Sequence, residues 1–216
     1  MKRTPLRQIC LVLILAVVAA YRTQGNEHGA ADAIAGIGAL LAGAYDNSAQ
    51  VTQGEATPGD HAPQHVTVTI EPTPRAEWQV WRVHMEVDPA VAKSAGSATA
   101  LDAIWAMNIL RPDHGTSFQL IPYTLRPSDD EAAVHGSTFD ETQWLSLEAC
   151  ELRGDAGASH IVAQVTANEM CVAEAMGLGG KRAFLPSRIE REGDWLRVQI
   201  SYFGEPWRVD ARRAVR

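Results

Sequence analysis

The seven histidines are the residues of this sequence that could most readily bind a metal or transfer a proton. They are scattered along the chain, and no two of them form the HxH or HExxH spacing that places two imidazoles on one face. No GxSxG segment marks a nucleophilic serine, and the acidic residues 129–131 are typical of a solvated loop rather than an acid–base pair. The sequence therefore predicts no metal site and assigns no catalytic residue.

Cysteines offer a second kind of chemistry, and their number favours a covalent cross-link. Cys10 lies in an apolar N-terminal run, which leaves Cys150 and Cys171 in the rest of the chain. An even pair in an exported protein is typical of a disulfide, and two free, buried thiols are the alternative. A disulfide that closes a loop of this length would stabilise the fold by roughly 3 kcal/mol in the loop-entropy model.

Aromatic and amide side chains supply the candidate binding residues. The chain has six tryptophans, and inside a barrel some of them could line a pocket for a flat apolar ligand. Trp105 and Asn108 lie on one predicted strand, and Gln119 and Tyr123 lie on the next. We expect these four side chains to face the interior and to contact the ligand. Packing of the tryptophans in an ordinary core is the alternative.

The predicted secondary structure that must position these residues changes from helix to strand along the chain. Residues 26–64 contain an Ala- and Gly-rich stretch with apolar residues at helical spacing, followed by a Pro- and Gly-rich loop. In residues 65–216, short segments of alternating apolar and polar residues are separated by turn signals, which is typical of antiparallel strands. Trp78 and Val80 break the alternation of their strand, which predicts a β-bulge near Val80.

A closed sheet is the simplest way to protect the edges of so many short strands. The sequence therefore predicts a mainly β fold, with one domain formed by a single antiparallel barrel of about eight to ten strands and one N-terminal helix that covers one end. A barrel of this size has room for packed side chains or for one small ligand.

The N-terminus has the order of a secretory signal peptide. Basic residues precede an uninterrupted apolar run at residues 9–20, and small residues end this run. Twelve helical residues rise about 18 Å, which is less than the roughly 30 Å of a bilayer core. We expect residues 1–25 to be removed and the mature chain to be exported, periplasmic or secreted, without membrane contact. An uncleaved anchor is the alternative.

The charge of the mature chain limits its partners. The full chain has 19 basic and 26 acidic residues, and residues 1–25 hold four of the basic ones and no acidic one. The remaining 15 basic residues against 26 acidic ones give the mature chain a net charge of −11. A chain as acidic as this is not expected to bind nucleic acid or to dock on an anionic membrane.

Several segments resemble the CpcT/CpeT-type chromophore lyases, a family that attaches phycobilins to light-harvesting proteins. Residues 40–50 are similar to the family's N-terminal motif, in which a glycine ends a helix, here Gly43, and is followed by Asn47 and Gln50. The two cysteine segments and the last strands are also similar, so that the likeness covers residues 36–205 in order.

The resemblance implies a lipocalin-like, calycin-type barrel that holds a linear tetrapyrrole, or bilin, and helps to attach it to a cysteine of an acceptor protein. It adds Asn47 and Gln50 to the four ligand-binding residues named above. The family carries a Tyr-Arg-Gln-Arg stretch on a central strand, whereas residues 117–120 here read Ser-Phe-Gln-Leu, which keeps Gln119 and lacks both arginines. Guanidinium groups are the expected partners of the two bilin propionates.

Three functions stay open from the sequence. The first is a lyase-like protein that binds a bilin or similar tetrapyrrole and assists its attachment to a cysteine of an unidentified acceptor protein. The second is an exported, non-catalytic, lipocalin-like carrier of a small apolar ligand. The third is a structural envelope protein whose barrel is filled by tryptophans. An interior void in the structure would separate the first two functions from the third.

Overall fold

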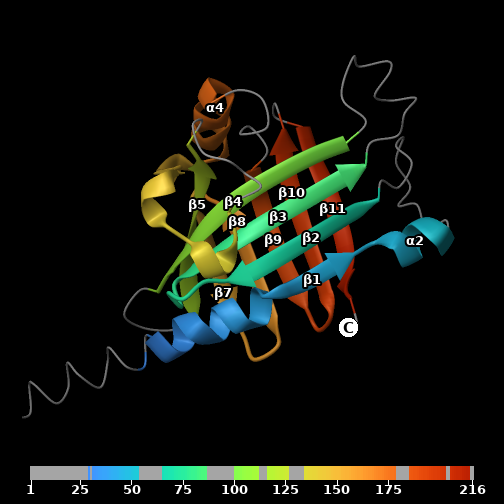
Figure 1. Cartoon of the computed structure of the whole chain (residues 1–216), viewed down its shortest axis with the longest axis horizontal. Coiled ribbons are helices and arrows are strands. Elements are labelled where there is room, and N and C mark those ends of the chain that lie inside the picture. Colours follow the sequence, from blue (N-terminus) through green and yellow to red (C-terminus); the bar gives the residue numbers. More distant parts are fainter. Residues whose placement is uncertain are drawn as a thin grey trace, which may run out of the picture.

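A closed β-barrel accounts for most of the described chain (Figure 1). The computed structural model describes residues 29, 31–53, 65–86, 100–111, 116–126, 134–178, 185–202 and 205–214. The predicted signal peptide, residues 1–25, and the predicted loop up to residue 64 lie outside the described residues, apart from the start of that loop.

Ten antiparallel strands form the ring of the barrel. Their order is β4-β3-β2-β1-β11-β10-β9-β8-β7-β5, and pairing of β4 with β5 closes the ring. β6 pairs with the same edge of β5 as β7 does, beyond the residues that β7 occupies. The bounds are β1 Gly43–Asp46, β2 Val66–Pro72, β3 Trp78–Glu86, β4 Ala100–Leu110, β5 Ser117–Leu125, β6 Trp144–Ser146, β7 Leu152–Ala156, β8 His160–Val165, β9 Leu185–Glu192, β10 Trp195–Tyr202 and β11 Glu205–Arg213. The predicted fold class is confirmed.

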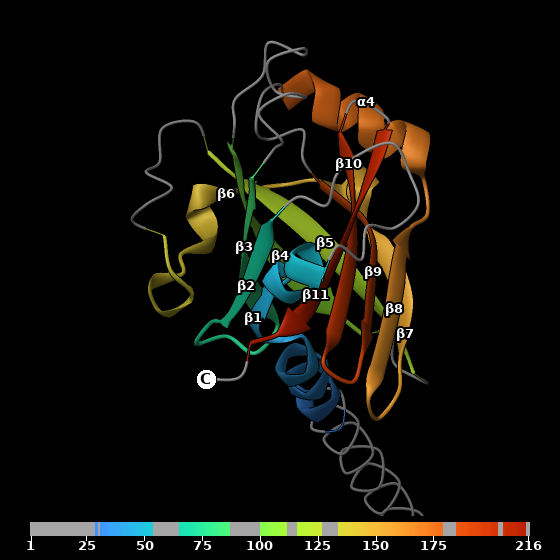
Figure 2. The ribbon, with the colours of Figure 1, turned by 90° about the vertical axis from the view of Figure 1, so that its right-hand side faces the viewer.

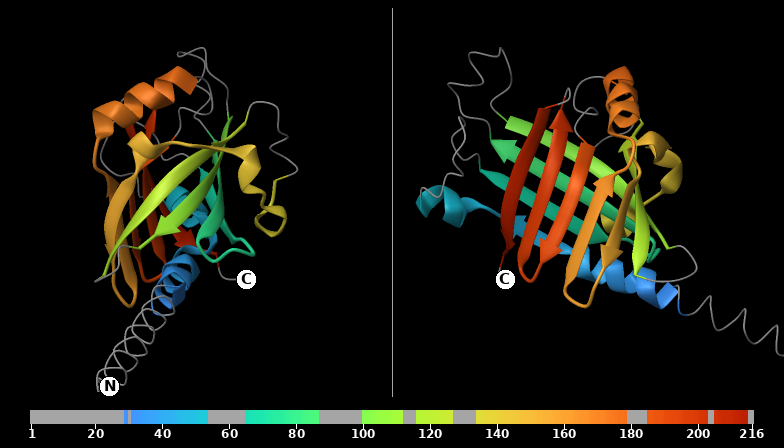
Figure 3. Two further views of the ribbon diagram at one scale, coloured as in Figure 1. Left: turned by 90° about the vertical axis from the view of Figure 1, so that its left-hand side faces the viewer. Right: turned by 180° about the vertical axis from the view of Figure 1, so that it is seen from behind.

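Helices cover both ends of the barrel (Figures 2 and 3). The predicted N-terminal helix is present at residues 31–41, and it crosses the end at which β1 begins, which is called the helix-covered end below. α4 (Asn168–Leu178) lies across the opposite end, called the α4 end below. The sequence pattern does not predict α4, because its apolar residues do not gather on one helical face. The shorter helices are α2 Ser48–Gln53, η2 Gly136–Thr138, η3 Glu141–Gln143 and η4 Glu148–Cys150.

Strand β3 shows how the alternation of side chains divides the barrel into an inner and an outer face. Trp81 and Val83 belong to the interior core, whereas Trp78 and Val80 belong to a second cluster on the outer face. The pairing of β3 with β2 and with β4 is continuous across Val80, so the predicted bulge is wrong. Apolar residues of both phases occur because this part of β3 is buried on both faces.

The second cluster lies over β3, β4 and β5, where residues 134–143 cover the outer face of the sheet. Its buried members are Trp78, Val80, Ile104, Ala106, Leu125, Val134 and Trp144, and Tyr123 and Phe139 pack against them. We call Trp78, Tyr123, Phe139 and Trp144 the outer aromatic cluster. Two apolar clusters, one inside the barrel and one outside it, therefore share the wall formed by these strands.

Candidate functional site

The barrel interior is the candidate ligand site, and its wall is apolar over most of its length. Every ring strand contributes at least one apolar residue to the interior core. Among the described residues, the buried inward-facing side chains that are not apolar are Gln79, Thr124 and Arg191. Such a wall suits an uncharged apolar ligand, because a charged group would lose its hydration there without gaining a partner.

The interior is closely packed. Trp81, Trp105, Met107, Phe118 and Leu120 each expose 1% or less of their surface, and no member of the interior core exposes more than 5%. A void that could hold water would leave accessible surface on the side chains around it. The described part of the core therefore has no large open void. This outcome by itself favours the structural function, and a ligand inside the barrel must displace side chains.

Polar groups at the helix-covered end hold the N-terminal helix on the barrel. The Nε2 group of Gln79 donates a hydrogen bond of 2.7 Å to the Gly38 carbonyl, and the Gln79 Oε1 accepts one of 3.3 Å from the Trp81 indole. The hydroxyl of Tyr45 donates to the carbonyl of Leu41 at 2.8 Å. These inward-facing polar side chains are thus used by the fold itself.

Arg191 is the cationic side chain of the described interior. It is 7% exposed and lies beside Ile161 and Leu196 on the two neighbouring strands, at the helix-covered end. Its Nη1 donates to the Ser159 carbonyl at 3.2 Å. The guanidinium therefore fastens the turn between β7 and β8, while its aliphatic stem fills the end of the core.

A disulfide closes the α4 end. Cys150 of η4 and Cys171 of α4 are joined by an S–S bond of 2.06 Å, which confirms the predicted pair. Both cysteines and Leu147 belong to the interior core. The cystine therefore attaches α4 directly to the packed interior, at the end opposite the N-terminal helix.

One of the four predicted strand residues faces the interior. Trp105 belongs to the interior core. Tyr123 packs against the outer cluster, and Asn108 and Gln119 alternate with core residues of β4 and β5, so all three lie on the outer face. The expectation that they face inward is wrong. Trp105 and Asn108 are an odd number of residues apart, which places them on opposite faces of β4, and Gln119 and Tyr123 share the face of β5 opposite to Phe118 and Leu120. Their roles as ligand contacts stay predictions.

The predicted motif residues at β1 have structural contacts. Asn47 is 8% exposed, and its Oδ1 accepts a hydrogen bond of 2.7 Å from the Val66 N–H. Gly43 has a φ of 155°, and a Cβ atom there would lie 2.8 Å from Nε of Arg213. Asn47 thus joins the end of β1 to β2, and the lack of a side chain at Gly43 leaves room for Arg213 of β11. The side chain of Gln50 is outside the description, and a ligand role for Asn47 and Gln50 stays a prediction.

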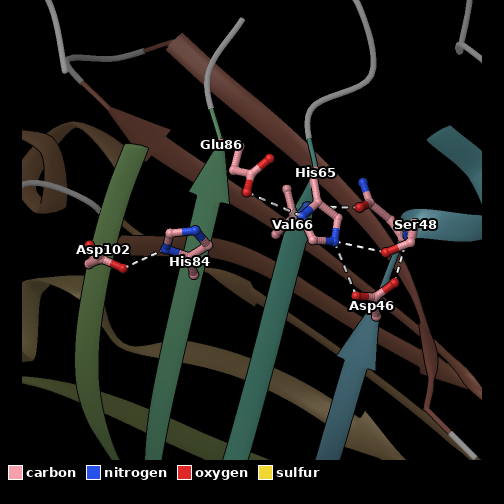
Figure 4. Close-up of polar contacts among 8 residues, drawn as sticks. Asp46, Ser48, His65, Val66, His84, Glu86 and Asp102 are labelled. Atoms are coloured by element: carbon pink, nitrogen blue, oxygen red, sulfur yellow. Dashed lines mark hydrogen bonds and ion pairs between the residues drawn. The ribbon is translucent and has the colours of Figure 1, made fainter. Parts of the chain in front are cut away.

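A polar network that the sequence motifs did not reveal joins β1, β2 and β3 at the α4 end (Figure 4). Nε2 of His65 lies 2.8 Å from Ser48 Oγ and 3.2 Å from Asp46 Oδ2, and Nδ1 lies 3.7 Å from Glu86 Oε1. Hydrogen bonds from the side chain and backbone of Ser48, together with His65, hold the pKa of Asp46 below its ordinary value, although burial opposes this shift.

Serine, histidine and a carboxylate are also the residue types of a nucleophilic triad. In a triad, one ring nitrogen accepts the serine proton, and the carboxylate holds the other nitrogen. Here Ser48 and Asp46 share Nε2, and Glu86 is too far from Nδ1 for a hydrogen bond. The network therefore joins the ends of three strands, and its arrangement differs from that of a triad.

A second histidine pairs with a carboxylate on the outer face of the sheet. Nδ1 of His84 lies 2.7 Å from Oδ1 of Asp102, its cross-strand partner (Figure 4). Within the described ranges, no group of three or more histidine, cysteine or acidic side chains is placed to hold a metal ion. No helix in the described part of the chain is long and apolar enough to cross a membrane.

No family model and no curated protein matches this chain. The resemblance to CpcT/CpeT-type lyases stays a hypothesis that depends on the residues quoted above.

Proposed function

We propose that this protein is a non-catalytic carrier that binds a small, uncharged apolar molecule inside its barrel. The supporting observation is the interior wall, to which every ring strand contributes buried apolar residues, and where two of the three polar residues, Gln79 and Arg191, hold the helix or a turn. The disulfide is compatible with export to an oxidising compartment, which we propose as the site of action.

The carrier must open to bind, because its interior is closely packed. Met85 and Met107 lie among the core residues, and methionine side chains adopt many shapes at little cost. We infer that the ligand-bound form is a minor state of the free protein, in which these side chains move and the ligand takes their place.

Attachment of a bilin is the second proposal, and it rests on the resemblance. A bilin brings two propionates that need cationic or hydrogen-bonding partners. Arg191, the cation of the described interior, bonds a turn through Nη1 while its buried Nε has no partner among the described residues, so this interior offers one cation for two propionates. An uncharged ligand is therefore better supported. An absorbance shift when phycocyanobilin is mixed with the purified protein would favour the lyase-like function, and the carrier proposal predicts no shift.

Titration with the uncharged probe N-phenyl-1-naphthylamine tests the carrier proposal. We expect the wild-type protein to enhance its fluorescence, and native mass spectrometry of freshly purified protein to show a bound small molecule. Leu120 is fully buried in the core, so Leu120→Ala should lower the free energy of unfolding by about 2–5 kcal/mol. The space that it creates should also increase affinity for the probe severalfold.

Val162→Ala provides the matched control, because Val162 is 39% exposed on the outer face of β8. It should change neither stability nor probe binding. If only Leu120→Ala binds the probe, or if neither protein binds it, the native barrel is filled by its own side chains. Either result would contradict the carrier proposal and favour a structural role.

A further inference from the structure

The outer aromatic cluster contains buried polar atoms without partners. Trp78 and Trp144 expose only 5% and 3% of their surfaces. Nε1 of each indole and Oγ of Ser146 find no hydrogen-bond partner among the described residues. Ser146 is the cross-strand partner of Tyr123, which places its hydroxyl on the same outer face. The three unpaired polar atoms thus belong to side chains on the same outer face of the barrel.

Such burial is unfavourable unless a partner compensates for it. An indole N–H that leaves water without meeting an acceptor loses a hydrogen bond, and buried tryptophans usually find one. A phenylalanine would supply similar apolar surface without this penalty. Two indole N–H donors and one hydroxyl are buried without a hydrogen-bond partner in the described part of the chain. They therefore point to a partner from outside the chain, which must bring hydrogen-bond acceptors.

The ring of Phe139 marks the place of that partner. Its centroid lies 4.9 Å from the ring of Trp78 and 6.2 Å from that of Trp144, with interplanar angles of 35° and 27°. Tyr123 packs edge-on against Trp78 at 4.7 Å. Phe139 thus lies between the two indoles, and it is partly exposed where both indoles are buried. A planar ring in its place would face the same two indoles.

The segment that carries Phe139 is attached to the barrel by polar contacts at separate points. The Gly136 N–H donates to the Glu71 carboxylate at 2.7 Å, and Arg126 Nε donates to the Thr142 carbonyl at 2.8 Å. Phe139 itself packs against the outer cluster and is not part of the interior core, so a movement of its ring would leave the contacts inside the barrel in place.

The charges beside the cluster favour an uncharged ligand. Arg75 lies 5.9 Å from the Trp78 ring, and its guanidinium forms ion pairs with Glu77 and Glu141. Two carboxylates therefore already balance this cation. Their excess negative charge would repel an anionic ligand.

We propose that the outer aromatic cluster is a binding site, separate from the barrel interior, for a planar, uncharged aromatic molecule with hydrogen-bond acceptors on its edges. The ligand ring replaces Phe139 between Trp78 and Trp144. Its acceptors pair with the two indole N–H groups and with the hydroxyl of Ser146.

Calorimetric titration with a matched pair of probes tests this site. 1,4-Naphthoquinone is planar and uncharged and carries two carbonyl acceptors, and naphthalene has the same ring system without them. We expect the full protein to bind the quinone at least tenfold more tightly than naphthalene. Trp78→Phe and Trp144→Phe should each remove most of that preference, and Phe139→Ala should increase the affinity for both probes.

Trp195→Phe is the control, because Trp195 is 37% exposed and lies at the start of β10, outside the cluster. It should leave quinone binding unchanged. Ser146→Ala removes only a hydroxyl, so it keeps the test informative if a tryptophan variant does not fold, and it should weaken quinone binding severalfold. The proposal would be overturned if the protein bound both probes equally or bound neither. It would also be overturned if quinone binding were unchanged in Trp78→Phe, Trp144→Phe and Ser146→Ala. Binding that survives all three substitutions belongs to the barrel interior.

Discussion

Gln79 carries two of the hydrogen bonds that close the helix-covered end of the barrel. Its amide bonds the Gly38 carbonyl and the Trp81 indole inside an otherwise apolar core. We expect Gln79→Leu to lower the free energy of unfolding by about 1–3 kcal/mol, because it leaves the buried Trp81 N–H unpaired. It also removes the bond to the Gly38 carbonyl, which keeps its bond from the Ala42 N–H. Urea unfolding monitored by circular dichroism measures this change.

Gln164→Leu is the control for that substitution. Gln164 is exposed, and its Oε1 accepts a bond from Arg188 on the surface, so its replacement should shift stability by no more than about 0.5 kcal/mol. Equal effects of the two substitutions would show that the Gln79 bonds contribute nothing specific to the attachment of the helix.

Asp46 makes the stability of the α4 end depend on pH. Hydrogen bonds from Ser48 and the contact with His65 lower the pKa of its carboxyl in the folded state. A carboxyl of this kind stabilises the fold while it is ionised, and this contribution is lost as the pH falls through the folded-state pKa. We expect Asp46→Asn to be less stable than the wild type at pH 7, and the difference to shrink below about pH 4.

Urea unfolding at a series of pH values measures the effect of Asp46. Asp102→Asn, which removes an exposed carboxylate that pairs with His84, controls for the change of net charge. A stability difference between Asp46→Asn and the wild type that stays constant from neutral to acidic pH would show that ionisation of Asp46 is not its cause.

At the scale of elements, α4 depends on its covalent attachment. Its apolar residues do not form a continuous stripe, and Cys171, the buried residue among its described side chains, is joined to η4 by the cystine. Closing a loop between residues 21 positions apart should stabilise the fold by about 3 kcal/mol. We expect the Cys150→Ala, Cys171→Ala double variant to lose about this amount in guanidinium unfolding.

Reduced wild-type protein separates the cross-link from the loss of two buried sulfur atoms. It should unfold at nearly the same denaturant concentration as the double variant. If reduction leaves the unfolding midpoint of the wild type unchanged, the disulfide does not constrain the unfolded chain, and α4 is held by other contacts.

Individual strands were predictable where apolar and polar residues alternate, as in β2 and β10. β7 was not, because residues 153–157 carry two glycines and an aspartate and predict a turn. In the structure this segment pairs with both β5 and β8, and the turn follows it. Pairing on both edges overrides the local preference of glycine, since it supplies backbone hydrogen bonds that a turn would not.

At the scale of the whole molecule, different interactions close the two ends of the barrel. Side-chain hydrogen bonds hold a helix at one end, and a disulfide holds α4 at the other. The packed interior means that ligand entry must loosen one of these attachments. The cystine makes α4 the harder one to detach, so the proposed carrier opens by rearrangement of its core side chains and of the helix-covered end.

The sequence pattern alone determined that the chain after residue 65 forms antiparallel strands and that a helix precedes them. It also determined that Cys150 can pair with Cys171. Alternation, helical spacing and cysteine number suffice for this, because they are properties of short segments or simple counts. It could not determine which face of β4 and β5 points inward, because both faces of these strands carry apolar residues and a period of two separates the faces without ranking them. Only the closed sheet decided which face points inward and that the interior is filled. It also decided that Trp78, Phe139 and Trp144 meet, because closure brings together residues far apart in the chain.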